Sequence, residues 1–177
     1  NSMQPVLFNQ QRPATPLACD TIQVELHQSK PPYCITATSK TVLLQNGIAN
    51  SVLKMPDTTA SYYLVVRHRN AIETWSSNTM TITGGITPPL YDFTNSSSKS
   101  FGNNMKLIGA NSWAFFSGDI NHDQNIDLVD MAALENDIDD FLFGYYNTDL
   151  NGDGNIDLLD LVTIENNINN FIFSNHP

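Results

Sequence analysis

The strongest constraint on the fold is a repeat near the C-terminus. The segment DINHDQNIDLVDMAALENDIDDFLF, which starts at Asp119, recurs as DLNGDGNIDLLDLVTIENNINNFIF, which starts at Asp149. About half of the aligned positions are identical, which chance does not produce. We infer a tandem duplication, so the two copies should fold alike.

The first twelve residues of each copy crowd acidic side chains together. The first copy places Asp119, Asp123, Asp127 and Asp130 in this stretch, with no Lys or Arg among them. Like charges at such density repel one another and favour an open chain. A folded form therefore needs a counter-charge from outside the polypeptide, and a metal ion is the obvious candidate.

The spacing in each stretch matches a calcium loop. Calcium takes six to eight oxygen ligands, which a twelve-residue loop supplies from positions 1, 3, 5, 7, 9 and 12. The predicted ligands of two Ca²⁺ ions are Asp119, Asn121, Asp123, Asn125, Asp127 and Asp130 in the first loop, and Asp149, Asn151, Asp153, Asn155, Asp157 and Asp160 in the second. Position 6, where the chain turns sharply, is Gly154 in the second loop but Gln124 in the first, so we expect backbone strain at Gln124.

A helical pattern follows each loop, and none precedes it. Apolar residues recur at helical spacing from Leu128 to Phe141 and again from Leu158 to Phe171. At loop position 8, Ile126 and Ile156 are suited to pairing the loops back to back, whereas His122 at position 4 should be solvated. The pattern also predicts a core position for four aromatic residues, Phe141, Phe143, Phe171 and Phe173.

Two loop–helix units of the form D-x-N-x-D-x-N-I-D-x-x-D resemble a dockerin module, over about 117–177. The resemblance implies a small helical domain with two F-hand calcium loops. It also implies an extracellular or cell-surface bacterial protein, with a cohesin-like or other surface protein as the partner. Dockerins commonly carry Ser-Thr at loop positions 10 and 11, where this chain has Leu128-Val129 and Leu158-Leu159. The calcium sites carry over to this chain, whereas the known cohesin specificity does not.

The apolar residues at positions 10 and 11 allow two interpretations. Leu128, Val129, Leu158 and Leu159 could form a partner-binding surface, or they could pack against the other helix or the N-terminal region. Packing is favoured, because large apolar patches are rarely left exposed. Exposure of these side chains would favour a docking surface instead.

The N-terminal region has the pattern of β-strands. TIQVELH, from Thr21 to His27, alternates apolar and polar residues as a half-buried strand does, and CITATS, TVLLQN, SYYLVVRHR and MTITGG continue the pattern between turn signals. Several short strands at this spacing predict an antiparallel sandwich. Short phrases such as QVEL and YDFT resemble an Ig-like or prealbumin-like module. The predicted fold class is therefore α+β multidomain, with a β-sandwich over 1–116 and a dockerin-like calcium-binding domain over 117–177, in contact through the aromatic residues around Trp113.

The distribution of charge supports two regions and limits the partners. All eight Lys and Arg residues lie before position 107, whereas thirteen of the eighteen acidic residues lie from Asp119 onward. The acidic C-terminal third argues against nucleic-acid binding, which needs Lys and Arg at the phosphates.

No apolar run is long enough to span a membrane. The first residues, NSMQPVLFNQ, lack the regions of a signal peptide and read as a mature end or as a cut from a longer chain. Cys19 and Cys34 fit one disulfide or two free thiols about equally.

The sequence contains no catalytic motif such as G-x-S-x-G, H-E-x-x-H or a Gly-rich phosphate loop. His68 and Glu73 read as an exposed polar pair at a turn, not as a ligand set. We expect a non-catalytic pair of modules that mediates assembly or attachment, with calcium as a folding cofactor. Two alternatives stay open: a carbohydrate-binding module braced by structural calcium, and the C-terminal tail of a larger extracellular enzyme. A polysaccharide platform would draw on Trp75, Trp113, Tyr62, Tyr63 and Tyr91.

Overall fold

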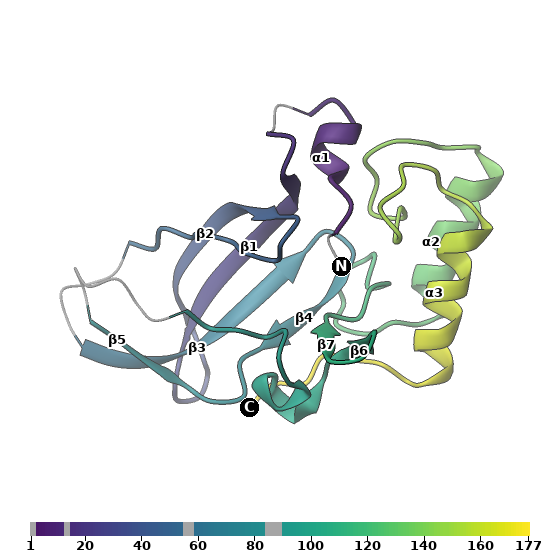
Figure 1. Ribbon diagram of the computed structural model, residues 1–177. Coiled ribbons are helices and arrows are strands. Elements are labelled where there is room, and N and C mark those ends of the chain that lie inside the picture. The colour runs from purple at the N-terminus through teal and green to yellow at the C-terminus, as the bar shows by residue number, and fades with distance from the viewer. Residues whose placement is uncertain (1–2, 13–14, 55–58, 84–89) are drawn as a thin grey trace.

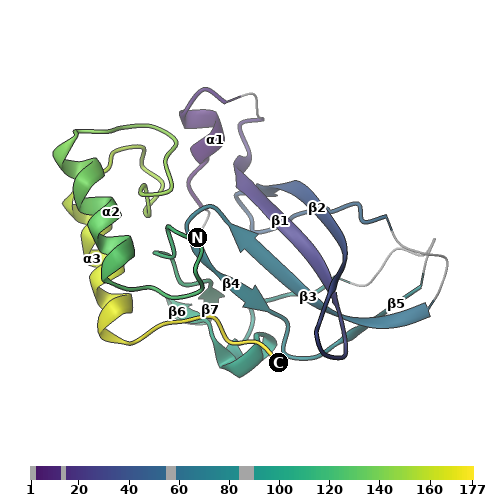
Figure 2. The same ribbon diagram turned by 180° about the vertical axis from the view of Figure 1, so that it is seen from behind.

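An antiparallel sheet and a pair of helices stand side by side (Figure 1). The structure, a computed structural model, describes residues 3–12, 15–54, 59–83 and 90–177. Seen from behind, the short helix α1 (Val6–Asn9) lies beyond one end of the sheet, close to the loops that join the two longer helices (Figure 2). The α+β class predicted from the sequence is confirmed.

The main sheet has five strands. They are β1 (Ala18–Gln28), β2 (Ile35–Leu44), β3 (Thr59–His68), β4 (Ala71–Trp75) and β5 (Met80–Thr83). The order is β2-β1-β3-β4, and β5 pairs with the other half of β3, beyond β4. The predicted strand segments are confirmed, although CITATS and TVLLQN join into the single strand β2 because no turn interrupts them.

One face of the sheet carries an apolar core. Ile22, Val24 and Val66 pack there against Phe93 and Met105. The cover comes from the chain between β5 and α2, which includes two 3₁₀ turns, η1 (Ser97–Lys99) and η2 (Phe101–Asn103), and a hairpin of β6 (Lys106–Ile108) and β7 (Ser112–Ala114). The second layer of the expected sandwich is thus, over the described residues, a two-stranded hairpin with irregular chain.

The two long helices begin at the ends of the repeated loops. They are α2 (Leu128–Asp139) and α3 (Leu158–Asn169). Asp127 and Asp157 cap their N-termini in capping boxes that are completed by Asp130 and Asp160, as acidic side chains at these positions do. The acidic residues at loop positions 9 and 12 therefore start the helices, whether or not they also bind a metal.

The helices and the sheet share a core. Leu134 of α2 and Ile164 of α3 are fully buried together with Ile72 of β4, and Phe116 packs against the same cluster. The expected contact through the aromatic residues around Trp113 holds for Phe116, which packs on this shared core, whereas Trp113 itself packs on the core of the sheet. Ile72 and Phe116 make that contact, and the boundary at 116/117 stays a prediction. Within the described ranges, no helix is long and apolar enough to cross a membrane.

Candidate metal centre

Each loop is closed by the carboxylate at its last position. Asp130 Oδ1 accepts hydrogen bonds from the main-chain N–H groups of Ile120 (2.8 Å) and Asn121 (3.1 Å), and its Oδ2 accepts one from Asp127 (3.1 Å). Asp160 makes the same three contacts in the second loop, at 2.8, 3.0 and 3.1 Å. One buried side chain thus ties the start of each loop to the start of the helix that follows.

The middle of each loop is held by hydrogen bonds between Asn and Asp residues. The N–H groups of Asp123 and Asn125 donate to the side-chain oxygens of Asn121 and Asp123, at 2.9 Å each. The corresponding distances in the second loop are 2.7 and 2.8 Å. The Asn125 N–H holds the pKa of Asp123 below its usual value. The two loops therefore have the same local shape, as the repeat predicts.

Positions 4 and 6 of both loops adopt the left-handed backbone conformation. The φ angles lie between 62° and 85° at His122, Gln124, Gly152 and Gly154. The strain expected at Gln124 is therefore present, because only glycine adopts such angles freely. Glycine is favoured at position 6 of the second loop for a further reason, because a Cβ on Gly154 would overlap the side-chain amide of Gln10, which follows α1. The N-terminal segment packs directly on the second loop, whereas His122 in the first is exposed, as predicted.

The carboxylates at position 1 are buried and incompletely hydrogen-bonded. Among the described residues, Asp119 Oδ1 and Asp149 Oδ2 have no hydrogen-bond partner. Burial and the nearby charges of Asp130 and Asp123 raise the pKa of Asp119 to about 6. Burial also raises the pKa of Asp149 to about 6, although Arg69 acts in the opposite direction. A buried carboxylate oxygen without a partner is costly, so both positions are suited to a cation.

Each loop pairs with the segment that follows the helix of the other unit. Asn125 of the first loop forms a β-bridge with Phe173, which follows α3, and Asn155 of the second forms one with Phe143, which follows α2. The predicted back-to-back pairing of Ile126 and Ile156 is not observed in the described part of the chain. Both lie in the shared core, because the antiparallel helices place the end of one beside the loop of the other.

The apolar residues at loop positions 10 and 11 lie on the surface. The exposed fractions are 66% for Leu128, 61% for Val129, 68% for Leu158 and 63% for Leu159. The favoured prediction that they pack inside the protein is therefore wrong. These residues form the first turn of each helix, and their side chains lie on the side of the helix opposite Leu134 and Ile164, which fill the core.

The predicted core position of the aromatic residues is also wrong. Phe141 and Phe171 are 86% and 84% exposed, and Phe143 and Phe173 are exposed as well. Phe141 and Phe171 follow the helix ends with φ of 54° and 51°, so the helical path that would have turned them inward has already ended. Phe141 and Phe143 line a shallow hollow with Leu158, where the end of α2 meets the start of α3.

His27 and Trp75 of the sheet belong to a separate polar cluster. His27 Nε2 lies 2.8 Å from Glu25 Oε2, and Arg67 pairs with both Glu25 and Glu73. The expectation that Glu73 is exposed is wrong, since it is buried and accepts a hydrogen bond from Trp75 Nε1. Trp75 is itself 6% exposed, which leaves no ring face for a sugar.

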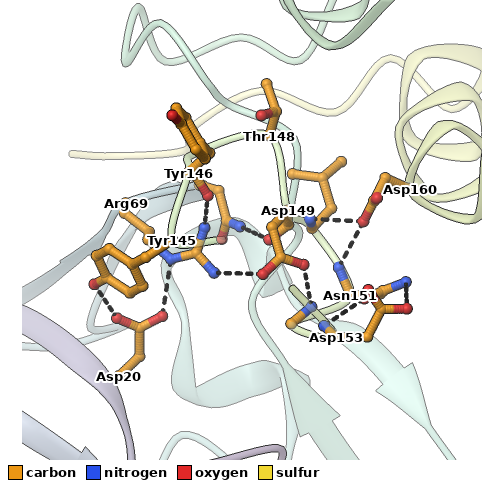
Figure 3. A network of polar contacts seen from close by, with 12 residues as sticks. Asp20, Arg69, Tyr145, Tyr146, Thr148, Asp149, Asn151, Asp153 and Asp160 are labelled. Carbon is orange, nitrogen blue, oxygen red and sulfur yellow. Dashed lines mark hydrogen bonds and ion pairs between the residues drawn. The ribbon is translucent and has the colours of Figure 1, made fainter. Parts of the chain in front are cut away.

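Arg69 and Asn70, in the turn between β3 and β4, have a role that the sequence does not indicate. Asn70 Nδ2 donates to the carbonyl of Asp149 (2.8 Å), and the Asn70 carbonyl accepts from Gly118 N–H (2.7 Å). Arg69 reaches Asp149 from the sheet side (Figure 3). This turn therefore holds the chain next to position 1 of both loops. A contact between such distant positions leaves no local pattern in one sequence.

The donor set of the loops fits a hard cation. Across the described residues, no three His, Cys, Asp or Glu side chains gather closely enough to hold a metal ion. The predicted sites, however, combine carboxylates with Asn and main-chain oxygens, which are the ligands that calcium prefers and not those of zinc or copper. The unpartnered oxygens of Asp119 and Asp149 lie at the position where such a loop begins its ligand set. The residues present are thus compatible with calcium.

Comparison of the chain with family models, with curated proteins and with solved structures found no match.

Proposed function

We propose that the chain is a non-catalytic, calcium-binding module pair of a secreted or cell-surface bacterial protein, and that it works in protein assembly or attachment. One observation carries the proposal. Both repeats bury the position 1 carboxylate and leave one of its oxygens without a hydrogen-bond partner among the described residues. A cost repeated in both copies is best explained by a cation that offsets it.

The twelve residues predicted as ligands would hold one Ca²⁺ in each loop. Bound calcium supplies a concentrated positive charge among carboxylates that otherwise repel one another. The chain's own residues orient the donors: Asp130 and Asp160 tie each loop to its helix, and the Asn residues fix the turns between ligands. Binding free energy would therefore appear as stability of the helical region.

The exposed helix starts and ends support a docking role. Apolar side chains gather where α2 ends and α3 begins, around Phe141, Phe143 and Leu158. The repeat puts the matching residues, Phe171, Phe173 and Leu128, at the opposite end. From Asp119 onward the chain has acidic residues and no Lys or Arg. A fitting partner is a protein surface with apolar hollows and a rim of Lys and Arg, because apolar anchors supply affinity and complementary charge supplies orientation.

Calorimetric titration of the calcium-free protein with CaCl₂ tests the proposal. We expect two binding events in the wild-type chain and one in each of Asp119→Ala and Asp149→Ala. Asp139→Ala, which removes an exposed acidic residue at the end of α2, should keep both sites and is the matched control. Helical circular dichroism followed in parallel should show a higher melting temperature with calcium. A wild-type chain that takes up no calcium and melts identically in chelator would refute the proposal.

A further inference from the structure

The sheet region reaches one loop carboxylate and not its equivalent. Arg69 Nη2 lies 3.7 Å from Asp149 Oδ2 at position 1 of the second loop. Asp119 occupies the same position in the first loop, and no ion pair reaches it within the described chain. The position 1 carboxylates of the two loops thus differ in one fixed positive charge, whereas at the first loop Arg67 acts on His122 at position 4.

Arg69 is held in place by several contacts that do not involve the loop carboxylate. Its Nε donates to Asp20 Oδ2 at 2.9 Å, and its Nη1 donates to the carbonyl of Tyr146. The guanidinium also lies over the ring of Tyr145, 4.8 Å from the centroid, and Tyr145 Oη donates to Asp20 at 2.5 Å. Figure 3 shows this network between the sheet and the second loop. The Arg69 side chain is only 10% exposed, so it has little freedom to move away when an ion arrives.

We propose that Arg69 is a built-in counter-ion of the second loop, which supports that loop without calcium and makes it the weaker of the two calcium sites. This inference rests on the proposed function. Without calcium, the guanidinium offsets the charge of the buried Asp149 carboxylate. With calcium on the same carboxylate, the guanidinium and the ion would be like charges that share one counter-ion, and they would repel one another.

The order of the two calcium affinities distinguishes an effect of Arg69 from loop chemistry alone. The loop sequences by themselves predict that the second site binds calcium more tightly. Gly154 fits the left-handed backbone at position 6, whereas Gln124 in the first loop is strained there. On that ground the second site would be the tighter one. A weaker second site can therefore not be explained by loop chemistry and requires a contribution from outside the loop, for which Arg69 is positioned.

The experiment measures each site separately in the full chain. Asp119→Ala leaves the second site and Asp149→Ala leaves the first, and each is titrated with CaCl₂ by calorimetry. We expect the second site to have the higher Kd. Arg69→Gln added to Asp119→Ala should lower that Kd about tenfold or more, because a single charge opposes a divalent ion by roughly that factor even at the dielectric constant of water, and Arg69 is largely buried. Arg69→Gln added to Asp149→Ala should leave the first site unchanged.

The matched control is Arg12→Gln. Arg12 lies 5.2 Å from the centroid of the same Tyr145 ring, so its replacement changes the net charge equally and close to the second loop. We expect it to leave the Kd of the second site unchanged. The gain from Arg69→Gln should also be larger for Tb³⁺ than for Ca²⁺, because the repulsion scales with the charge of the ion. A residue that only supported the fold would give neither a tighter site nor this dependence.

Several outcomes would overturn the inference. They are an unchanged or higher Kd of the second site in Arg69→Gln, an equal gain from Arg12→Gln, and an equal or smaller gain for Tb³⁺. If Arg69→Gln does not fold, the two single-site variants still decide, since a tighter second site would overturn the inference. A wild-type chain that binds no calcium would refute the proposed function itself, which is a different result from calcium bound at two sites without an effect of Arg69.

Discussion

The calcium-free protein should become more stable as the solution is acidified from pH 7.5 to pH 5. Asp119 and Asp149 each have a pKa of about 6 in the folded protein, against an ordinary value of 3.8. A carboxyl group with a higher pKa in the folded state binds protons more readily when folded, so the free energy of unfolding rises as the pH falls through 6 toward 4. This direction is opposite to that of ordinary acid denaturation.

The magnitude follows from the two pKa values. For a folded pKa of about 6 and an unfolded pKa of 3.8, each carboxyl group gains about 1.4 kcal/mol between pH 7.5 and pH 5. The two groups together give about 3 kcal/mol if they act independently. His122 opposes the gain: although the residue as a whole is exposed, partial desolvation of its ring and the charge of Arg67 lower its pKa, so its protonation favours the unfolded chain. Asp20 does not contribute in this range, since the pKa of this carboxyl lies well below its usual value and its loss of stability begins only near pH 4.

Urea unfolding of metal-stripped protein, followed by helical circular dichroism at both pH values, measures this change. The double variant Asp119→Asn, Asp149→Asn imitates the protonated carboxyls and should lose most of the rise between pH 7.5 and pH 5, while Asp160, whose pKa burial also raises, keeps the remainder. With saturating calcium the trend should reverse, because the ion requires ionised carboxylates. Calcium-free wild type that loses stability over this range would refute the reasoning that the two carboxylates are strained by burial.

Two further predictions concern the backbone and the cysteines. Gln124→Gly should raise the free energy of unfolding by about 1 kcal/mol by relieving the left-handed strain, whereas Gly154→Ala should lower it through strain and overlap with Gln10, and chemical denaturation that gives both changes the same sign would contradict this. Both cysteines are free thiols in the structure, and burial raises the pKa of Cys19 to about 11, so a disulfide-exchange reagent at pH 8 should label exposed Cys34 fast and Cys19 only on unfolding. A Cys34→Ser variant should lack the fast phase.

The sequence predicted the parts of the fold that depend on neighbouring residues. Alternation in TIQVELH identified β1, and the repeat identified two loops of one shape, each followed by a helix. The apolar residues at helical spacing include Leu134 and Ile164, and both lie in the core. The same spacing failed for Phe141 and Phe171, because it carries no information on where the helix ends and the chain turns left-handed.

Contacts between distant segments could not be predicted in this way. AIETW is not among the segments that alternation predicts as strands, yet it forms β4, a strand buried along its whole length, and supplies Ile72 to the helical core. The crowded aspartates predict a counter-charge from outside the polypeptide, yet at the second loop the chain itself supplies one. Arg69 lies far from the loops in the sequence, and only folding brings its charge to Asp149. This pairing depends on the tertiary structure, and it leaves no pattern that can be recognised in a single sequence.

The crossed bridges between the units have a consequence for how such a module can exist at all. The residue that bridges to Asn125 of the first loop belongs to the second unit, and the residue that bridges to Asn155 of the second loop belongs to the first. A lone unit therefore carries the bridging segment for a neighbour and none for itself, so two separate copies would have to exchange these segments to form both bridges. The segment between the units, 144–148, makes this exchange intramolecular. It holds each unit near the other at an effective concentration that separate copies would not reach. Duplication here joins two halves that are complete only as a pair.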